Sequence, residues 1–585
     1  MPDLPLPVEV LAAAALAGIA AALGARVRRL LRVPLQPGLR LAVDFVVGGW
    51  VLAAVLLLLG LLHAWRPWLV ACVPLVLAVV AKWRGNGWRS AQLLGPLLGA
   101  AVALPLAVAP PFFYDALVYH LGLPWQALLE GGLHAHPEDL FSAFPPLAQL
   151  LAAMPLAVGL VRVPALVNWW SFVLAGAAVG ALSRTLGAPR WAALLAAACV
   201  PLLPGDALVA GLPAAEGLAL VGIVTAVTVA LGRAPGVGAA SLAGLLVGAA
   251  TAARVQGVPW ALIVIVLIVV RSRERWRAGL AAAGGWLAGS APWWVKNLVL
   301  LGAPLAPIGW RGEGAGILWR EGGVLMNLGL SPLEMVRQLT VAVVPHAAYL
   351  APLALAAVLA SLPPGGNRPR LAAVAALAAL AAWGLTGIVP RFLAPALGVV
   401  LAVAGSAARR GRPGAWAAGL ALAVTAAVGV TFAVTGLRRF GPAWLLNPTR
   451  SVSSGWLPND PFPAFAAARG LPARARVLFV GEPRGFGFPR RFVAPSQFDV
   501  SPLRSVLETS ADPGEACARL RRRGFTHILV NWGELDRLAV GYPVAPWRDV
   551  QGWRRWRAFV TRLGPPVVDV ASVQVFALSP AGPPV

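Results

Sequence analysis

Charged side chains and cysteines are scarce in this sequence, and each shortage excludes a class of protein. Only 12% of the 585 residues are charged, whereas 59% are hydrophobic and the mean hydropathy is +0.75. Soluble domains carry about 25% charged residues, so the composition excludes a soluble globular protein and indicates a polytopic membrane protein. The three cysteines, Cys72, Cys199 and Cys517, stand far apart, which supports neither a disulfide framework nor a zinc site.

Phosphate-binding glycine motifs are also missing from the sequence. The glycine-rich stretch at 481–488 reads GEPRGFGF and has the spacing of neither a P-loop nor a GxGxxG turn, so nucleotide binding is unsupported. The net charge of +25 would suit a nucleic-acid partner, but the arginines fall in short loops between apolar runs. The positive-inside rule accounts for that distribution, and we expect no nucleic acid to bind.

Apolar runs long enough to cross a bilayer recur up to about residue 440. They predict an all-α bundle of about 12–14 transmembrane helices. We expect the basic clusters between the runs to face the cytoplasm. These clusters lie at residues 26–32, 82–89, 271–277, 367–370 and 409–412.

The long polar segments then share the opposite, external side. They are a first loop at 111–145, a second at 301–340 and the chain after about residue 437. One segment stays open: counting 146–161 as a full span conflicts with the sidedness of Arg184 and Arg190, and a re-entrant or tilted segment would restore parity.

The composition changes after the membrane module, which we assign to residues 1–440. Polar residues return, and strand-like stretches alternate with helix-like ones, so residues 449–585 predict a small soluble α/β domain on the external side. The strand-like stretches are ARVLFVGE, RRFVAPSQF, THILVNW and VVDVASVQVFAL, and the helix-like ones are DPGEACARLRRRG and WRRWRAFVTRLG. The basic helix faces suit either a solvated surface or anionic head groups.

The first external loop is an acidic island in a basic chain. No Lys or Arg occurs between Arg89 and Arg162, which keeps the loop outside by the insertion rule. Asp115 directly follows an apolar run and is expected at the outer membrane surface, with Tyr119 and His120 one helical turn further on. The stretch GLPWQALLEGG then predicts an amphipathic helix lying in the interface.

Four patterns in chain order resemble the GT-C class of integral-membrane glycosyltransferases, which use polyprenyl-phosphate sugars and include protein mannosyltransferases and the lipid A aminoarabinose transferase. The patterns are YDALVYHLGLP with FPPLAQLL, LAGLLVGAATAARVQG, APWWVKNLVLLGAPLAPIG and VPRFLAPAL. The resemblance spans about residues 90–410, and it implies juxtamembrane helices in the first loop and a catalytic base at Asp115. Arg254 departs from the family pattern, since many relatives have Lys at that position. Arginine keeps the positive charge but replaces the compact ammonium with a planar guanidinium.

Such an enzyme needs a base for the acceptor hydroxyl and cations for the departing phosphate. Asp115 is the candidate base, although an interfacial acid that caps a helix is the alternative. Arg254, Lys296 and Arg391 are the candidate phosphate-binding residues, and the alternative for them is anchoring of helix ends by snorkelling. Three cations on the outer face oppose the insertion rule, however, and therefore need partners.

The remaining candidates carry weaker signals. Glu216 is the candidate second acid, with Asp206 as its competitor, and a carboxylate at a helix N-terminus is the alternative for Glu216. Candidate cavity residues are Tyr119, His120, Asn297 and His346. His134 and His136, with two acids nearby, are a weak signal for a divalent metal, and we expect neither a metal nor another cofactor.

The sequence thus predicts an inverting glycosyltransferase of the bacterial inner membrane with an active site facing the periplasm. Its partners would be a polyprenyl-phosphate-sugar donor, membrane lipids and a glycan, lipid or protein acceptor. A polytopic transporter or lipid flippase is the leading rival, and an inactive membrane scaffold is the third alternative. A transporter is expected to have repeated halves with ionisable groups at the midplane, whereas here the candidate charges gather at one face.

Overall fold

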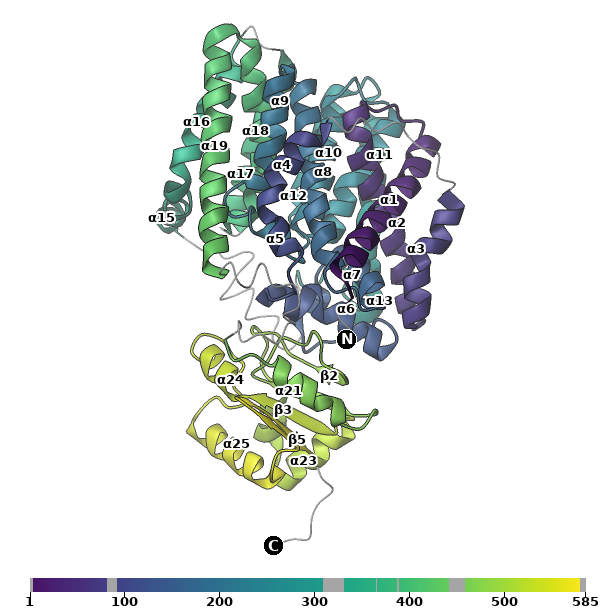
Figure 1. Ribbon diagram of the computed structural model, residues 1–585, viewed down its shortest axis with the longest axis vertical. Helices are drawn as coiled ribbons and strands as arrows, with labels where there is room; N and C mark the ends of the chain where they lie inside the picture. The colour runs from purple at the N-terminus through teal and green to yellow at the C-terminus, as the bar shows by residue number, and fades with distance from the viewer. Residues whose placement is uncertain are drawn as a thin grey trace.

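The computed structural model describes residues 4–81, 92–308, 331–363, 366–386, 389–440 and 458–578. Within these ranges the N-terminal part is a bundle of helices, and a mixed α/β domain lies at one end of it (Figure 1). The predicted helical membrane bundle with a C-terminal α/β domain is confirmed. The 82–89 cluster, most of the 301–340 loop and the expected domain start at 449 fall outside the described residues.

Apolar helices form the bundle. Six of those described are long and apolar enough to cross a membrane by length and composition, and shorter apolar helices of 10–17 residues accompany them. The bundle helices are α1 (Leu6–Leu30), α2 (Pro37–Leu61), α3 (Pro67–Ala81), α4 (Leu94–Ala100), α5 (Leu104–Ala107), α8 (Val163–Thr185), α9 (Arg190–Cys199), α10 (Glu216–Leu231), α11 (Val237–Ala253), α12 (Gly257–Arg271), α13 (Arg275–Leu301), α15 (Pro332–Val343), α16 (Ala347–Ser361), α17 (Asn367–Thr386), α18 (Ala394–Ser406) and α19 (Gly411–Phe440).

Glycines bring α11 and α13 into backbone contact. A Cβ on Gly244 would lie 2.0 Å from the carbonyl oxygen of Ala282, and one on Gly248 would lie 2.7 Å from the Cα of Gly289. Small residues four apart allow such close approach in membrane helices. The packing fixes the ends of both helices, where Arg254 and Asn297 lie.

Part of the first predicted basic cluster is buried rather than solvated. Helix α1 continues to Leu30, and Arg28 donates two hydrogen bonds to Asp44 of α2, at 2.6 and 3.0 Å. A second ion pair joins Arg162 to Glu9 at 2.7 Å. Removing one partner of such a buried pair leaves an uncompensated charge, so these pairs specify how α1 packs.

The first external loop and the segment that follows it fold into short helical turns. They are η3 (Ala116–His120), α6 (Gly122–Glu130), η4 (Leu140–Ala143) and α7 (Leu147–Leu156). Ten residues in α7 rise only about 15 Å, half the thickness of the hydrocarbon core. Residues 146–161 therefore do not form a full-length helical span, and the alternative of a shorter segment is the one that the structure favours.

The C-terminal domain is a five-stranded sheet in the order β2-β1-β3-β5-β4. Strands β2, β1 and β3 are parallel, and β5 and β4 continue the sheet antiparallel. The bounds are β1 (Arg476–Val480), β2 (Arg491–Val493), β3 (His527–Asn531), β4 (Val568–Val570) and β5 (Val573–Ala577), with helices α21 (Phe462–Ala467), α22 (Pro502–Thr509), α23 (Pro513–Arg522), α24 (Trp532–Ala539) and α25 (Val550–Leu563). All four predicted strand stretches and both predicted helices form.

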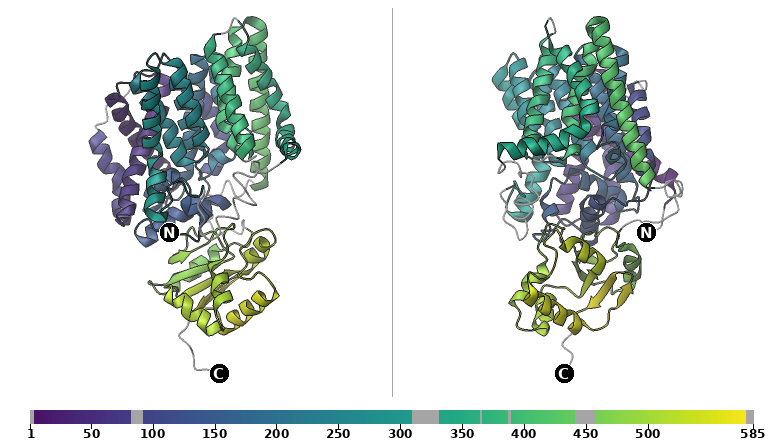
Figure 2. Two further views of the ribbon diagram at one scale, coloured as in Figure 1. Left: turned by 180° about the vertical axis from the view of Figure 1, so that it is seen from behind. Right: turned by 90° about the vertical axis from the view of Figure 1, so that its left-hand side faces the viewer.

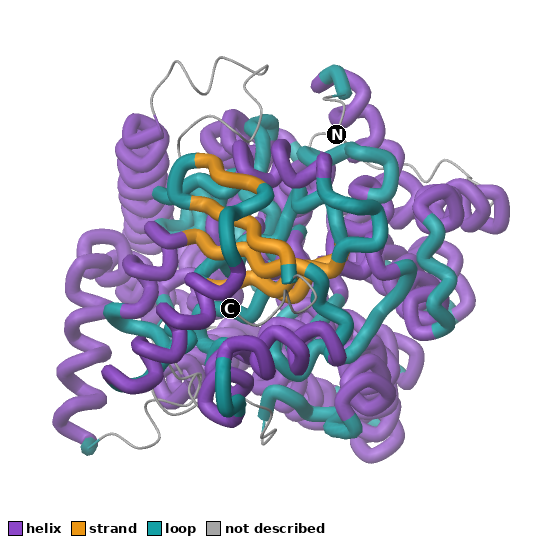
Figure 3. Tube along the Cα trace, turned by 90° about the horizontal axis from the view of Figure 1, so that it is seen from below, coloured by secondary structure: helices purple, strands orange, loops and turns teal. Residues whose placement is uncertain are grey.

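The sheet lies close to the end of the bundle (Figures 2 and 3). One apolar cluster contains Phe479 and Phe492 of the sheet together with Leu117 and Leu121 of the external loop. The other face of the sheet packs against α22, α23 and α25 through a separate cluster. The C-terminal domain therefore shares a hydrophobic core with the loop that carries Asp115.

Candidate functional site

Asp115 has helical backbone angles and directly precedes a π-helical turn. The turn, η3, begins at the next residue, and π-turns often occur at functional sites. The Oδ2 atom of Asp115 accepts a hydrogen bond from Arg391 Nη2 at 3.0 Å and one from the Tyr119 hydroxyl at 3.5 Å. The Asp115 side chain is 23% exposed, so it can be reached from outside the protein.

Four charged residues from four segments form a continuous chain. Arg391, in η9 (Pro390–Leu393), also contacts Glu216 through Nε, at 3.5 Å from Oε1. The same Glu216 oxygen lies 2.5 Å from Nη1 of Arg254. Acids and guanidinium groups thus alternate in the order Asp115, Arg391, Glu216 and Arg254, which we call the charge cluster.

Local structure explains how each member is positioned. Glu216 is the first residue of α10, where a carboxylate is stabilised by the helix dipole. Arg254 is the C-cap residue of α11 in an extended conformation, so its side chain leaves the helix axis. Phe392 lies beneath both guanidinium groups, with its ring centroid 4.5 Å from Arg254 Cζ and 5.5 Å from Arg391 Cζ. This cation–π contact was not anticipated, although Phe392 belongs to the quoted VPRFLAPAL pattern.

Asp206 lies in a turn that precedes α10, near the charge cluster. Its side chain is 1% exposed, and neither carboxylate oxygen has a hydrogen-bond partner among the described residues. Asp206 interacts electrostatically with Glu216, Arg391 and Arg254. The structure therefore brings both candidates for the second acid, Glu216 and Asp206, to one place.

Asn168 of α8 holds this acidic segment. Its Nδ2 donates to the carbonyl oxygens of Val209 and Leu212, both at 2.9 Å, and its Oδ1 accepts from Gly217 N at 3.1 Å. Nothing in the sequence distinguished this buried amide from other polar residues in membrane helices.

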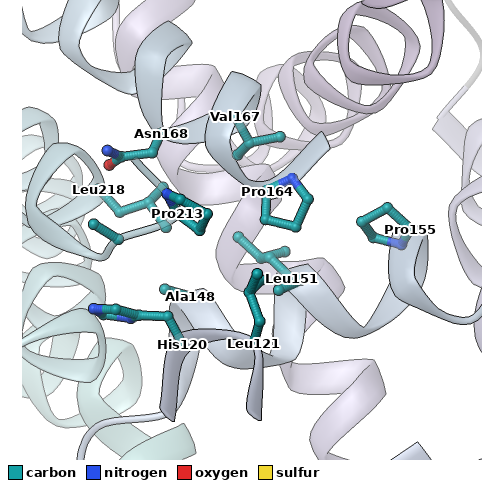
Figure 4. A pocket seen from close by; sticks show the side chains of 12 residues that line it. His120, Leu121, Ala148, Leu151, Pro155, Pro164, Val167, Asn168, Pro213 and Leu218 are labelled. Carbon is teal, nitrogen blue, oxygen red and sulfur yellow. The ribbon is translucent and has the colours of Figure 1, made fainter. Parts of the chain in front are cut away.

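His120 and Tyr119 lie beside the charge cluster. Their rings are 4.2 Å apart, and burial lowers the pKa of His120 to about 4, so its imidazole is neutral at pH 7. His120 lines a pocket with Asn168, Pro213 and Leu218 (Figure 4). His120 thus lines a pocket, and the roles of Tyr119 and His120 as cavity residues of the active site remain predictions.

Lys296 and Asn297 lie in a different cluster, which anchors the external loop to α13. The Lys296 ammonium donates to the carbonyl oxygen of Ser142. Asn297 Nδ2 donates to the carbonyl oxygens of Ala143 and Ala306, at 2.9 and 2.6 Å. The carboxylate that interacts electrostatically with Lys296 is Asp139, which is not part of the charge cluster. The phosphate-binding role of Lys296 therefore stays a prediction, and this geometry does not favour it.

His346 lies at the N-terminus of α16, with its ring 5.7 Å from that of Tyr349. Tyr349 in turn interacts electrostatically with Asp206. No contact within the described ranges places His346 in the charge cluster, and its role as a cavity residue remains a prediction.

The sequence matches no family model and no curated protein. Solved structures do match. ArnT from Cupriavidus metallidurans in the apo state has a TM-score of 0.51 at 15% identity, with 84% of this chain and 99% of ArnT covered. ArnT bound to undecaprenyl phosphate has a TM-score of 0.49 at 16% identity over the same shares. The chain has the GT-C fold.

A third similar structure is the Archaeoglobus fulgidus oligosaccharyltransferase in complex with Zn and sulfate, with a TM-score of 0.46 at 16% identity over 77% of this chain and 69% of that one. The GT-C architecture that the four sequence patterns implied is confirmed by the ArnT fold. At these identities the likeness concerns the fold alone, so the chemistry is argued from this chain's own residues.

The C-terminal domain also contacts the external loop that carries Asp115. The guanidinium groups of Arg484 and Arg537 each lie 5.6 Å from the ring centroid of Tyr114, the neighbour of Asp115. Arg484 is itself fixed by Glu482, with both contacts at 2.6 Å. Tyr114 is thus in contact with two cations, of which Arg484 is buried and Arg537 is 46% exposed.

Four hydrogen bonds also join the C-terminal domain to the external loop. Phe486 N donates to Leu117 O at 3.2 Å, Trp125 Nε1 to Phe488 O at 2.8 Å, Gln126 Nε2 to Phe492 O at 3.1 Å and Leu140 N to Asp499 Oδ2 at 3.0 Å. We call these four bonds and the Tyr114 contacts the loop clamp. No local pattern predicts the loop clamp, because the two partners of each contact are more than 350 residues apart in the chain.

The histidine pair of the loop is involved in other contacts. His136 lies 3.0 Å from Glu130 and 3.5 Å from Glu138. Burial opposes protonation, but the hydrogen bonds with these two carboxylates prevail and raise the pKa of His136 to about 10. His134 stacks on His63, with centroids 4.5 Å apart. Within the described ranges no group of three or more His, Cys, Asp or Glu could hold a metal ion.

Proposed function

We propose that this chain transfers a sugar from a polyprenyl-phosphate carrier to a glycan, lipid or protein acceptor at the external membrane face. The observation that carries the proposal is the charge cluster. One partly exposed carboxylate, Asp115, and two guanidinium groups, Arg391 and Arg254, gather from segments far apart in the chain. ArnT, whose fold this chain shares, has been solved bound to undecaprenyl phosphate.

Asp115 is proposed as the base. The acceptor oxygen attacks the anomeric carbon from the face opposite the phosphate, and its proton passes to the Asp115 carboxylate. The bond between the anomeric carbon and the phosphate oxygen breaks, and the electron pair leaves with the lipid phosphate. The configuration at the anomeric carbon is therefore inverted.

Arg391 and Arg254 are proposed to hold the departing phosphate. A guanidinium can offer two parallel N–H groups to phosphate oxygens. Glu216 contacts both guanidinium groups through a single oxygen, so it orients them toward one ligand. Because Arg391 also contacts Asp115, the proposed base and the proposed phosphate site belong to one ion-paired unit, which supports near-contact catalysis.

We further propose the bacterial inner membrane as the location, with the C-terminal domain outside. The lack of Lys and Arg between Arg89 and Arg162 supports an external loop, and the loop clamp requires the domain on the same side. The transporter or flippase reading is less well supported, since the charge cluster lies at the end of the bundle next to the domain.

A transfer assay tests the proposal directly. The full-length protein in nanodiscs is incubated with radiolabelled undecaprenyl-phosphate sugars and envelope lipid or glycan acceptors. We expect stoichiometric release of undecaprenyl phosphate and a product with inverted anomeric configuration by NMR. Movement of labelled lipid across proteoliposomes without transfer to any acceptor would favour the flippase instead.

A further inference from the structure

We propose that a cavity at the other end of the bundle binds an anionic phospholipid, with its phosphate at Arg184 and Arg190 and an acyl chain along the paired faces of α8 and α9. The cavity measures about 320 Å³, within the range of small-molecule pockets. Asn168 and Arg184 are separated by about 24 Å along α8 at 1.5 Å per residue. The cavity is therefore distinct from the charge cluster, and the inference does not depend on the proposed function.

Small residues form the walls of the cavity. They belong to antiparallel helices α8 and α9, whose backbones approach at Gly180, where a Cβ would lie 3.2 Å from the carbonyl oxygen of Ala193. The wall residues are Ala177, Gly180, Ala181, Ala193 and Ala197. From Arg184 to Ala177, and from Arg190 to Ala197, the trough is about 10 Å long. It is therefore polar at one end and apolar at the other.

The polar end carries positive charge without a matching acid. Arg184, Arg190, Gln36 and Gln92 line it, and none of the cavity residues is a carboxylate. Both arginines are exposed, and in the described part of the chain neither forms an ion pair. One N–H of Arg184 donates to the carbonyl oxygen of Ala188, which leaves its other donors for a ligand. Two guanidinium groups complement a phosphodiester.

The rim of the cavity points to a lipid rather than to a soluble anion. Leu194 lines the cavity and is 43% exposed, and its neighbours Trp191 and Leu195 are 42% and 43% exposed on the same short helix. In a bilayer these side chains face lipid. A free phosphate would satisfy the arginines but leave the apolar trough unfilled, whereas a phospholipid fills both ends.

Native mass spectrometry of the delipidated full-length protein tests this site. We expect dioleoyl phosphatidylglycerol to bind at least tenfold more tightly than dioleoyl phosphatidylcholine. The double variant Arg184→Gln/Arg190→Gln should lose that preference. The matched pair Arg273→Gln/Arg275→Gln removes the same charge from exposed positions at the same end of the bundle and should change the affinity by less than twofold.

Ala177→Leu tests the trough separately from the charge. It should weaken binding of dioleoyl phosphatidylglycerol several-fold and leave dihexanoyl phosphatidylglycerol unaffected, because only the long chain reaches position 177. If the glutamine pair does not fold, Arg184→Lys/Arg190→Lys keeps the charge and should keep the preference. Equal loss in the Arg273/Arg275 pair, equal binding of both head groups, or full displacement by millimolar inorganic phosphate would each overturn the proposal.

Discussion

Replacing the proposed base is the most direct test of the charge cluster. Asp115→Asn keeps the shape of the side chain and its ability to accept a hydrogen bond from Arg391, which lies 3.0 Å away. It removes the group that receives the acceptor proton. A positioned general base contributes about 10²- to 10⁴-fold in rate, or about 2.7–5.5 kcal/mol at about 1.36 kcal/mol per decade. We expect kcat to fall by that factor.

The cost to folding should be far smaller. The Asp115 and Arg391 side chains are 23% and 25% exposed, and Arg391 keeps its contact with Glu216 at 3.5 Å. Because the asparagine can still accept the hydrogen bond from Arg391, the melting temperature should move by only a few degrees. The predicted loss of activity is thus several times what lost stability can explain.

The assay is single-turnover transfer with saturating labelled donor, run beside thermal melting of each variant. Glu138→Gln is the matched control, because it neutralises another carboxylate of the same loop. It should retain activity within about threefold. If Asp115→Asn keeps more than a tenth of wild-type turnover, Asp115 is not the base and the reasoning from the charge cluster fails.

Three further predictions address the rest of the site. Arg391→Lys keeps the charge but replaces the fork by a single ammonium, and since a charged hydrogen bond is worth about 1.5–3 kcal/mol, we expect the donor KM to rise at least tenfold. Tyr114→Leu removes the ring that the loop clamp holds, and should lower kcat about tenfold with the donor KM nearly unchanged. Asp499 and Asp139 are buried together at the domain contact, and burial raises both pKa values, that of Asp499 to about 7. The protonated pair therefore stabilises the folded protein fully below about pH 4, and this stability is lost as the pH rises from 4 through 7; the melting temperature should fall over that range.

Each of these predictions has its own control. Tyr114→Phe keeps the ring and removes a hydroxyl that has no hydrogen-bond partner among the described atoms, so it should behave as wild type; equal loss in both variants would refute the clamp. Asp499→Asn should flatten the pH dependence, whereas an unchanged slope would assign it to Asp139 alone, whose pKa burial also raises. An unchanged donor KM in Arg391→Lys would show that Arg391 does not bind the donor phosphate.

Much of the fold could be predicted because local sequence patterns determine its helices and strands. The continuous apolar runs predicted the helical bundle. Short runs rich in β-forming residues predicted strands such as β1 and β3, which are almost completely buried in the structure. The convergence of Asp115, Arg254 and Arg391 was predicted from a resemblance in four ordered patterns. Spacing alone would not have brought these three residues together.

The rest depended on tertiary contacts that a single sequence does not reveal. Lys296 and Arg254 were expected on one membrane face, and no local signal told that α13 directs Lys296 to the loop backbone at Ser142. Asn168 became informative only when its amide was seen to hold two carbonyl groups of a distant turn. The loop clamp pairs segments such as Trp125 and Phe488 that share no motif.

The loop clamp also sets when the external loop can complete its contacts during synthesis. Trp125 and Gln126 leave the ribosome more than 360 residues before the carbonyl groups that they bond. At about 5–20 residues per second, the loop waits about 20–70 s for its partners to be made. A nascent or truncated chain that already sits in the bilayer would therefore hold an unfinished reaction centre, and catalysis would begin only after the ribosome has read nearly the whole message.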